Sequence, residues 1–413
     1  MGLIVQKYGG TSVGTIERMQ RVADRIIETK EQGNDVVVVV SAMGKSTDVL
    51  VDMAKQITAQ PSEREMDMLL STGEQVSIAL LAMTLQTKGY EAVSLTGWQA
   101  GITTESYHSR ARIQDIEHTR LKKELAEGKI IIVAGFQGFT PDGEITTLGR
   151  GGSDTTAVAL AASLEADKCE IFTDVSGVFT ADPRVVPSAQ KLDRISYDEM
   201  LELANLGAGV LHPRSVETAK KYSVCLVVRS SFTKEDGTYV EEGSSMETGR
   251  VISGVAHDED VAKITVVGMP AQVGTLSRLF NTLASAQVNV DIIIQSSYEA
   301  KVTNISFTVA SGDLAKTLQV LEQNRTELGF ESVDHEEELT KVSIVGAGMV
   351  TNPGVAAEMF RQLAEQQISI KMVSTSDIKI SCVIPAAYTN LAVTTLHTAF
   401  GLDVAEQAVV HGV

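Results

Sequence analysis

The sequence predicts an α/β protein in which helices cover both faces of a mostly parallel sheet, followed by a duplicated small unit of order βαββαβ. Two observations support this class. Up to about residue 230, apolar runs of strand length alternate with helical patterns, which is typical of parallel sheets. After a polar stretch, one pattern of strands and helices occurs twice, with Ile264 aligned on Val342. Two copies suggest a duplicated domain, since a solenoid needs at least three.

The first half is divided into elements by its hydrophobic periodicity. The unbroken valine run 36–40 is typical of a strand buried on both faces. The segment 16–30 has apolar residues at helical spacing. By the same criteria, strands are expected at 3–6, 36–40, 92–95, 130–133, 169–173 and 224–228. Helices are expected at 16–30, 66–87, 155–164 and 197–206.

The second half contains a connector and the repeat. Residues 231–262 are acidic and contain several glycines, so we expect a polar connector with a hairpin near Asp236-Gly237. Each repeat copy has a strand, a glycine-containing loop, an amphipathic helix, two strands, a helix and a strand. The expected organisation is 1–230, connector 231–262, first copy 263–338 and second copy 339–413.

Composition narrows the possible partners. The 413 residues include 53 acidic and 35 basic side chains, a net charge of -18. This charge disfavours nucleic acid and anionic membranes. Three scattered cysteines do not form a disulfide framework. We find no signal-peptide pattern and only strand-sized apolar runs, so a cytoplasmic protein is expected.

Glycine-rich segments follow three of the predicted strands. They are Lys7-Tyr8-Gly9-Gly10-Thr11-Ser12, Gly135-Phe136-Gln137-Gly138 and Gly149-Arg150-Gly151-Gly152-Ser153-Asp154. Glycines let backbone N–H groups converge on an anion, and a following helix N-terminus adds positive potential. The alternative is that a glycine pair merely marks a tight turn. The two segments that carry Lys7 and Arg150 favour a phosphate and carboxylate site at the carboxyl ends of the strands.

Other motifs are incomplete. Gly44-Lys45-Ser46 lacks the first glycine of a P-loop, since Val39 stands in its place. The seven histidines show no metal-ligand spacing, and there is no Cys/His cluster.

Taken together, the motifs of the whole chain resemble those of the aspartate kinases, with a C-terminal repeat that resembles tandem ACT domains. The similarity is strongest to the lysine-responsive Bacillus type. The matching segments are 7–12, VVVVVSAM at 36–43, 70–74, 149–154, 173–178, 181–184 and Leu211-His212-Pro213. The resemblance implies the amino-acid kinase αβα sandwich and ATP-dependent phosphorylation of the β-carboxylate of L-aspartate. It further implies the pathway to diaminopimelate, lysine, threonine and methionine.

The resemblance also assigns roles to residues of this sequence. Lys7 matches the lysine that bridges the phosphoryl group, Asp154 the residue that organises Lys7, and Glu74 the residue that holds the substrate ammonium. The substrate-binding positions are Ser41, Thr47, Glu74, Arg150, Gly151, Gly152 and Ser153. The nucleotide positions are Lys7, Gly9, Gly10, Thr173, Asp174, Phe179, Asp182 and Arg184. For Asp154, simple capping of the following helix is the alternative.

Two positions depart from the family pattern. Phe179 stands where many relatives have an aromatic hydroxyl, so that hydrogen bond would be lost. Gly209 stands where many have a lysine, which puts one nucleotide-phosphate contact in doubt.

The implied chemistry agrees with the residues present. A carboxylate nucleophile is ionised at neutral pH, with a reference pKa of about 4, so no general base is required. Catalysis should then depend on positioning and on charge neutralisation by Lys7, Mg²⁺ and loop N–H groups. The implied cofactors are ATP and Mg²⁺; the sequence does not identify the magnesium ligands, although Asp174 and Asp182 are candidate neighbours.

The repeat is expected to bind an amino-acid effector where ACT domains meet, with lysine favoured and threonine, alone or with lysine, left open. Asp291 could pair with a lysine ammonium while helix N–H groups take its carboxylate. The first-copy positions are Met269, Gly274, Thr275, Asn289, Val290, Asp291, Gln295 and Ser296. The second-copy positions are Val355, Ser369, Ile370, Ser376 and Asp377. Lys371 replaces Asp291 in the second copy, so the two sites should not be equivalent.

Alternatives remain open. The repeat could serve only for dimerisation, and we expect a homo-oligomer or an assembly with a separate C-terminal fragment started at Met246. Another amino-acid kinase, such as glutamate 5-kinase, acetylglutamate kinase or uridylate kinase, is a further possibility. A catalytically inactive amino-acid sensor is the non-enzyme alternative. Intact Lys7, Glu74, Arg150 and Asp154 argue against it.

Overall fold

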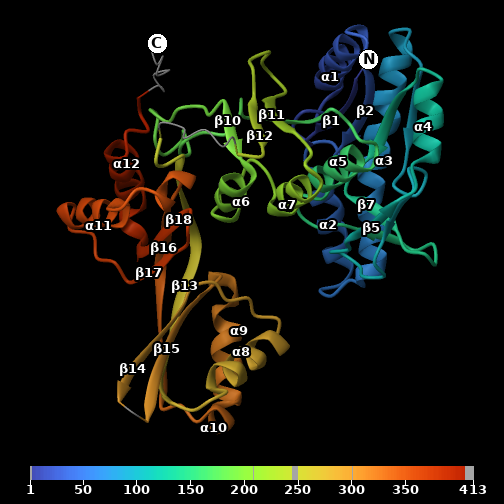
Figure 1. Ribbon diagram of the computed structural model, residues 1–413. Coiled ribbons are helices and arrows are strands. Elements are labelled where there is room, and N and C mark those ends of the chain that lie inside the picture. The colour runs from blue at the N-terminus through green and yellow to red at the C-terminus, as the bar shows by residue number, and fades with distance from the viewer. Residues whose placement is uncertain (1, 208, 244–249, 300, 405–413) are drawn as a thin grey trace, which may run out of the picture. The chain divides into compact units, whose positions relative to one another are not determined.

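A computed structural model describes residues 2–207, 209–243, 250–299 and 301–404. Within them the chain divides into two compact units (Figure 1). Unit 1 takes the described parts of 1–179, 191–205 and 209–246, and unit 2 those of 180–190, 206–208 and 247–413. Met246, considered above as an internal start, lies outside the described residues.

Unit 1 is built on an eight-stranded sheet of order β10-β12-β11-β9-β1-β2-β6-β3. Its neighbouring strands run parallel, except that β11 and β12 are antiparallel. The strands are β1 Leu3–Tyr8, β2 Asp35–Val40, β3 Ala92–Leu95, β6 Ile130–Ala134, β9 Lys168–Thr173, β10 Arg194–Ser196, β11 Leu226–Ser230 and β12 Thr238–Glu241. The expected parallel sheet is therefore confirmed.

A second, four-stranded sheet of order β5-β4-β7-β8 was not predicted. It consists of β4 Ile102–Thr104, β5 Ile113–Ile116, β7 Gln137–Phe139 and β8 Ile145–Thr147. These strands have three or four residues each, too few to give a recognisable alternating pattern.

The helices of unit 1 include the four that the periodicity predicts. They are α1 Ile16–Glu31, α2 Ser46–Ile57, α3 Glu63–Thr87, α4 Thr119–Ala126, α5 Gly152–Ser163, α6 Tyr197–Asn205 and α7 Pro213–Tyr222. Helices α2, α4 and α7 were missed. For α7 a signal was present, because Pro213 at the first helical turn follows the N-cap His212.

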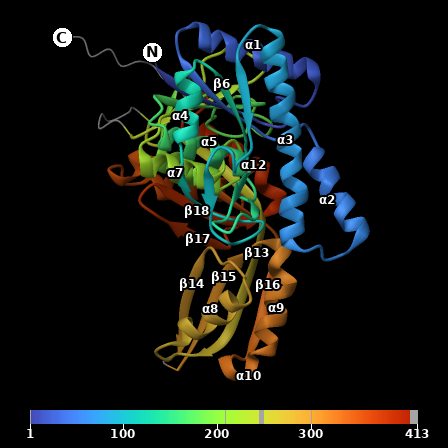
Figure 2. The same cartoon turned by 90° about the vertical axis from the view of Figure 1, so that its right-hand side faces the viewer.

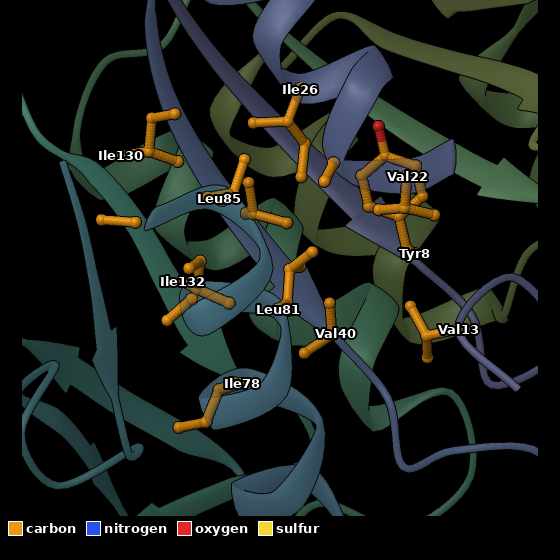
Figure 3. Packing of buried hydrophobic residues seen from close by; sticks show 14 of the residues in the cluster. Tyr8, Val13, Val22, Ile26, Val40, Ile78, Leu81, Leu85, Ile130 and Ile132 are labelled. Carbon is orange, nitrogen blue, oxygen red and sulfur yellow. The ribbon is translucent and has the colours of Figure 1, made fainter. Parts of the chain in front are cut away.

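Strand alternation separates the two faces of the large sheet. Val36, Val38 and Val40 share one buried cluster with residues of α1 and α3 (Figure 3). Val37 and Val39, on the opposite face, are also fully buried, and α5 packs on β1, β2 and β9. Both faces are thus covered, which explains the unbroken valine run.

Helix α3 meets the length and composition criteria for a membrane span, and 44% of its most apolar window is buried inside the protein. Ile78, Leu81 and Leu85 pack on the sheet (Figure 3). The same helix buries Asp67 and Glu74. Packing on the sheet accounts for the buried apolar residues of this helix, while Met68, Val76 and Met83 are exposed.

Unit 2 contains one six-stranded sheet of order β14-β15-β13-β16-β18-β17 (Figure 2). The strands are β13 Gly254–Pro270, β14 Ile293–Glu299, β15 Val302–Val309, β16 Ser332–Val345, β17 Met372–Thr375 and β18 Lys379–Pro385. The helices are α8 Thr275–Ser285, α9 Leu314–Gln323, α10 Arg325–Leu328, α11 Val355–Glu365 and α12 Thr389–Ala399, with short 3-10 turns η1 Ser311–Asp313, η2 Ala347–Val350 and η3 Ala386–Tyr388.

The two repeat copies are interleaved rather than consecutive. The first part of β13 pairs with the part of β16 that opens copy 2, as in Gly254↔Val345. Its last part pairs with the part of β16 that closes copy 1, as in Lys263↔Glu336. The strand expected after α12 is not found among the described residues up to 404, and the start of β13 takes its place.

Parts of the expected connector 231–262 belong to the large sheet and to the sheet of unit 2 instead. Within 231–262, β12 belongs to the large sheet, and its antiparallel pairing with β11 gives the hairpin expected there. Residues from Gly254 onward are part of β13. The acidic run 258–260 suggests part of a linker because it is strongly polar. Its side chains are partly or fully exposed, but it lies within strand β13.

Candidate active site

The carboxyl ends of the parallel strands carry most of the predicted site residues. Gly9 follows β1, Ser41 follows β2, Gly135 follows β6, Asp174 follows β9 and Ser231 follows β11. Because these strands are parallel, the five positions lie at one edge of the sheet. This is the edge where open α/β sheets bind ligands.

Lys7 and Asp154 form an ion pair across β1 and α5. The Lys7 Nζ lies 2.6 Å from Asp154 Oδ1, and each side chain is 12% exposed. Lys7 is on the α5 face of β1 because Tyr8, its neighbour, lies in the cluster of the opposite face. Asp154 lies in the first turn of α5, whose N-cap is Gly151, and its side chain holds the ammonium group of Lys7.

Two serines join the loop after β2 to the start of α5. Ser41 Oγ donates to Ser153 Oγ at 2.9 Å. A Cβ atom at Gly135 would lie 2.6 Å from Ser153 Oγ, so only glycine permits this close approach. The backbones of the first two loops are also joined, because Gly44 N donates to the carbonyl of Gly10 at 3.0 Å.

Glu74 lies on α3 with 3% of its surface exposed. Its Oε1 accepts a hydrogen bond from Ala42 N at 3.1 Å. The other oxygen, Oε2, is buried and has no partner among the described residues. Burial raises the pKa of Glu74 to about 7, against the lowering effect of the backbone N–H donors.

Position 151 requires glycine because of its backbone conformation and because of the atoms around it. It is the N-cap of α5 with a φ of 67°, and a Cβ atom there would lie 2.2 Å from His212 Cβ and Cγ. His212 in turn caps α7, with Nδ1 accepting from Arg214 N. Burial lowers the pKa of His212, and the positive charge of Arg214 lowers it further.

The remaining substrate positions are less constrained. Arg150 is exposed, and its guanidinium has no partner within the part of the chain that the structure describes. Thr47 is partly buried in the first turn of α2. Gly152 lies in the first turn of α5, where its Cβ would meet Phe136 at 2.8 Å.

A second group of predicted residues gathers at the ends of β9 and β11. Thr173 Oγ1 donates to Asp174 Oδ1 at 3.0 Å. Ser231 Oγ donates to the carbonyl of Thr173 at 3.0 Å, and Ser12 Oγ donates to Ser231 Oγ at 2.9 Å. Ser12 and Ser231 were not predicted as site residues, although each follows a predicted strand.

The other nucleotide positions are divided between the units. Phe179 belongs to unit 1, where it bridges to Lys191. Asp182 and Arg184 belong to unit 2 and pair with each other at 2.7 Å; hydrogen bonds from Arg184 lower the pKa of Asp182. Gly209 has a φ of 65°, a left-handed conformation that favours glycine over the lysine of many relatives.

Asp67 is a buried polar residue of this region for which the sequence analysis predicts no role. It lies seven positions before Glu74, and therefore on the same face of α3. Its side chain is fully buried and bonded to His108, Ser109 and Thr147. A carboxylate inside an amphipathic helix, two turns from a predicted site residue, was the available signal.

A cavity of about 640 Å³ lies elsewhere in unit 1, beside the outer side of α5. Its charged lining includes Arg112, Asp115, Arg214, Glu217 and Lys221. Neither Lys7 nor Glu74 lines it, so it is separate from the strand-end site.

No group of three or more His, Cys, Asp or Glu side chains suited to a metal occurs among the described residues. Asp174 is exposed at the end of β9. Such an oxygen ligand suits a magnesium ion that is held mainly by phosphates and water. The three cysteines are free thiols.

In unit 2 the predicted effector residues of copy 1 surround the start of α8 and the following strand. Gly274 caps α8 with a φ of 91°. Met269 is buried in the core, whereas Asn289, Asp291, Gln295 and Ser296 are exposed and Val290 is partly exposed. Thr275, itself buried, donates its hydroxyl to the carbonyl of Pro270 at 2.7 Å.

Asp291 already has an internal partner. Lys341 Nζ, on a side chain only 9% exposed, lies 2.5 Å from Asp291 Oδ2 and 3.7 Å from Asp258 Oδ2. Lys371, which replaces Asp291 in copy 2, pairs instead with Glu336 at 2.7 Å. The two copies therefore differ in charge.

The other copy-2 positions lie at the corresponding places. Gly354 caps α11 with a φ of 102°, and Val355 begins that helix. Ser369, Ser376 and Asp377 are exposed, and Ile370 is partly buried.

The comparison with known proteins agrees with this geometry. A sequence model of the amino acid kinase family matches residues 2–230, and an ACT domain model matches 264–324 and 342–400. Unit 1 is therefore the catalytic part of an amino acid kinase, carried on the same chain as two ACT repeats.

Two similar proteins, one of them with two solved structures, narrow the class of kinase. The aspartokinase of Bacillus sp. (strain MGA3) is 61% identical over 98% of this chain and 98% of its own length. The crystal structure of E. coli aspartokinase III with aspartate and ADP is 27% identical, with a TM-score of 0.82 over 96% of this chain and 99% of that one. Its complex with lysine and aspartate has a TM-score of 0.73 over the same shares, also at 27% identity. The chain belongs to the aspartokinase family.

Proposed function

We propose that the enzyme transfers the γ-phosphoryl group of ATP to the β-carboxylate of L-aspartate, giving ADP and 4-phospho-L-aspartate. The observation that carries this proposal is the convergence of one cation and one unpaired carboxylate oxygen at the strand ends. Lys7 is held there by Asp154, and Glu74 Oε2 is buried with no partner in the described part of the chain. An anionic phosphoryl group and a substrate ammonium would satisfy them.

The roles follow from charge and reach. Glu74 takes the substrate ammonium, and Arg150 takes a substrate carboxylate in a bidentate manner. Ser41 and Thr47 orient the substrate, together with Gly151, Gly152 and Ser153 at the start of α5. The Gly9-Gly10 loop and Lys7 contact the β- and γ-phosphates, while Thr173, Asp174 and Phe179 contact the rest of the nucleotide. The nucleotide roles of Asp182 and Arg184 stay predictions from the resemblance.

In the reaction, an oxygen of the aspartate β-carboxylate forms a bond to the γ-phosphorus of ATP. The bond from that phosphorus to the β–γ bridging oxygen breaks, and ADP leaves with the electron pair. The nucleophile is already ionised, so no proton has to be removed from it. Lys7 neutralises charge as it develops on the transferred group.

Magnesium fits as a cofactor that enters with ATP and neutralises part of the charge of its phosphates. In unit 1, Asp174 is the carboxylate that we propose as its neighbour, directly or through water. The residues of this chain then act by holding and orienting two anions, which explains why a protein of net charge -18 needs local positive groups.

The test is aspartate-dependent ADP release, measured in parallel with glutamate and uridylate. We expect release with aspartate alone. Lys7→Ala should lower kcat by about 10²- to 10³-fold while the thermal unfolding temperature stays close to that of the parent. Near-parental turnover in Lys7→Ala would refute the mechanism, and release with glutamate or uridylate would favour the other amino-acid kinases considered above. Stabilisation by aspartate without any ADP release would indicate an inactive sensor.

We also propose that the ACT repeats make the enzyme respond to lysine, with threonine as a possible co-effector. The exposed Asp291 can offer Oδ1 to a lysine ammonium while Lys341 remains on Oδ2. The N-terminus of α8 is suited to the effector carboxylate. This fits an enzyme at the first step towards diaminopimelate, lysine, threonine and methionine.

Activity assays with lysine, threonine and both together test this regulation. Millimolar lysine should inhibit the parent enzyme, and Asp291→Ala should raise the half-inhibiting concentration at least about tenfold. The matched control is Lys371→Ala, at the corresponding place of copy 2, where the response should stay close to the parental one. An enzyme unaffected by millimolar lysine would exclude lysine control and leave dimerisation as the role of the repeats.

For location and assembly, we propose a cytoplasmic homo-oligomer that associates through its ACT repeats, with or without a separate chain started at Met246. Three free thiols and small soluble substrates support the location. Gel analysis of the expressed gene should show a second short chain if the internal start is used, and replacing Met246 by Leu should remove it.

A further inference from the structure

Asp67 is the most completely bonded buried carboxylate near the active site. Its side chain is fully buried on α3. The hydroxyl of Thr147 donates to Oδ1 at 2.5 Å, and Ser109 N donates to Oδ1 at 3.1 Å and to Oδ2 at 3.0 Å. His108 Nδ1 lies 2.8 Å from Oδ2. A carboxylate tolerates such burial when it is bonded in this way.

These partners belong to the two chain segments that border Arg150. Thr147 is the last residue of β8, three positions before Arg150. The carbonyl oxygen of Ser109 lies 3.1 Å from the position of a Cβ on Gly149. Asp67 thus ties α3 to both the strand that leads into the Gly149-Arg150 turn and the loop packed against it.

The same helix also holds Glu74, whose Oε1 accepts from Ala42 N. Asp67 and Glu74 are seven residues apart, which is about 10 Å along a rigid helix. One end of this span is bonded to the loop after β2, and the other to the segment before Arg150. The helix therefore sets the separation between the group proposed for the substrate ammonium and the group proposed for a substrate carboxylate.

We propose that Asp67 is a positioning residue of the aspartate subsite, which acts by fixing the Arg150 segment relative to Glu74. The inference rests on the proposed roles of Glu74 and Arg150. Since a positioning error of about 1 Å can lower rates strongly, loosening this link should weaken aspartate binding. The nucleotide-binding segments after β1 and β9 have no hydrogen bond to Asp67, so ATP binding should be spared.

The test measures KM for aspartate and for ATP in Asp67→Asn. Asparagine keeps the shape, but loses the charge and directs an N–H₂ group at partners that are themselves donors. We expect KM for aspartate to rise at least about tenfold and KM for ATP to change less than about twofold. Thermal unfolding is followed in the same samples, because lost bonds lower stability whatever the role.

A matched control is available on the same helix. Arg64 Nε donates to Glu144 Oε2 at 2.9 Å, which joins α3 to the β7–β8 connection through an exposed ion pair. Glu144→Gln should leave both KM values within about twofold of the parent. If it raises KM for aspartate as much as Asp67→Asn does, the effect is a general loosening of the hairpin and the proposal is overturned.

Thr147 provides a second pair of variants if Asp67→Asn does not fold. Thr147→Val removes the hydroxyl donor and should raise KM for aspartate, whereas Thr147→Ser keeps the donor and should restore it. Unchanged KM in both Asp67→Asn and Thr147→Val, with lowered thermal stability, would show a purely structural role. Arg150→Lys separates a failure of the proposed Asp67 role from a failure of the proposed aspartate subsite. If it leaves KM for aspartate unchanged, the subsite itself is wrong.

Discussion

Glu74 shows how burial can prepare a single residue for a charged ligand. The backbone N–H of Ala42 satisfies one oxygen, while the other is buried and lacks a partner within residues 2–207, 209–243, 250–299 and 301–404. The pKa of about 7 means that the group is about half protonated at neutral pH in the free enzyme. A substrate ammonium next to it would favour the ionised form and displace the proton.

We therefore predict that aspartate binding depends on pH. Because burial raises the pKa of Glu74 in the folded protein, ionising this carboxyl group costs free energy when no ligand is bound. Only the ionised carboxylate attracts the substrate ammonium. KM for aspartate should fall by up to about tenfold per pH unit as pH rises towards 7, and level off above it. The measurement is kcat/KM for aspartate between pH 5.5 and 8.5.

The control for this prediction is Glu74→Gln, which cannot ionise. Its KM should be higher than that of the parent and nearly independent of pH over the same range. A parental pH profile in Glu74→Gln would assign the titration to another group, and the proposed role of Glu74 would have to be abandoned.

At the scale of elements, the start of α5 determines the geometry of the site. Within one turn it presents Ser153 to Ser41 and Asp154 to Lys7. The helix can begin there because Gly151 takes a left-handed conformation against His212. The glycine-rich segment is thus required for packing as well as for the anion binding that we propose.

Replacing Gly151 by Ala should lower the unfolding free energy much more than the same replacement at a glycine that also has a positive φ but has free space around its Cα. At Gly128, φ is 80° and nothing lies within 4 Å of the added Cβ, so Gly128→Ala should lose about 1–2 kcal/mol of unfolding free energy. Gly151→Ala adds the clash with His212, for a further loss of about 1–3 kcal/mol. Urea unfolding and KM for aspartate are the measurements; equal losses in the two variants would show that His212 moves aside freely.

At the scale of the whole molecule, the chain order and the structural units do not coincide. Residues 180–190, which carry Asp182 and Arg184, belong to unit 2. Ala181 and Val186 are buried with Leu396 of α12, and Thr180 Oγ1 lies 2.9 Å from His397 Nε2. A segment with two proposed nucleotide residues is therefore part of the core of unit 2.

His397 should make the stability of unit 2 sensitive to mild acid. It is fully buried; burial lowers its pKa, with Asp403 opposing and Arg250 adding to the effect. The unfolded chain takes up a proton below about pH 6.5, which the folded form resists. Stability is thus fully present above that pH and should fall by up to about 1.4 kcal/mol per pH unit below it.

Urea unfolding at pH 7.5 and 5.5 checks this prediction. His397→Gln keeps a side-chain amide that can hydrogen-bond to Thr180 but cannot titrate. The difference in unfolding free energy between the two pH values should therefore shrink by about 1 kcal/mol. An unchanged difference would mean that carboxylates, not His397, control the response to acid.

Local patterns were sufficient for the long central strands of the large sheet and for four of the seven helices of unit 1. The valine run of β2 and the periodicity of α1 identify their structures because burial on two faces or on one imposes a fixed spacing. The three- and four-residue strands of the second sheet could not be found in this way. Lys7, Arg150 and Asp154 could be named because their motifs are specific, whereas Asp67 could not, since its partners are distant in sequence.

The sequence by itself determined the class of fold, the repeat and the residues at the strand ends, because these depend on local periodicity and on motifs. Only the tertiary structure decided that the copies share strands β13 and β16, that Asp291 is paired with Lys341, and that Asp67 joins α3 to the Arg150 segment. Each of these depends on strand pairing, or on an ion pair or hydrogen bonds to a buried carboxylate, between residues that are far apart in the sequence. A local pattern carries no information about which distant partner will satisfy a buried charge or an unpaired strand.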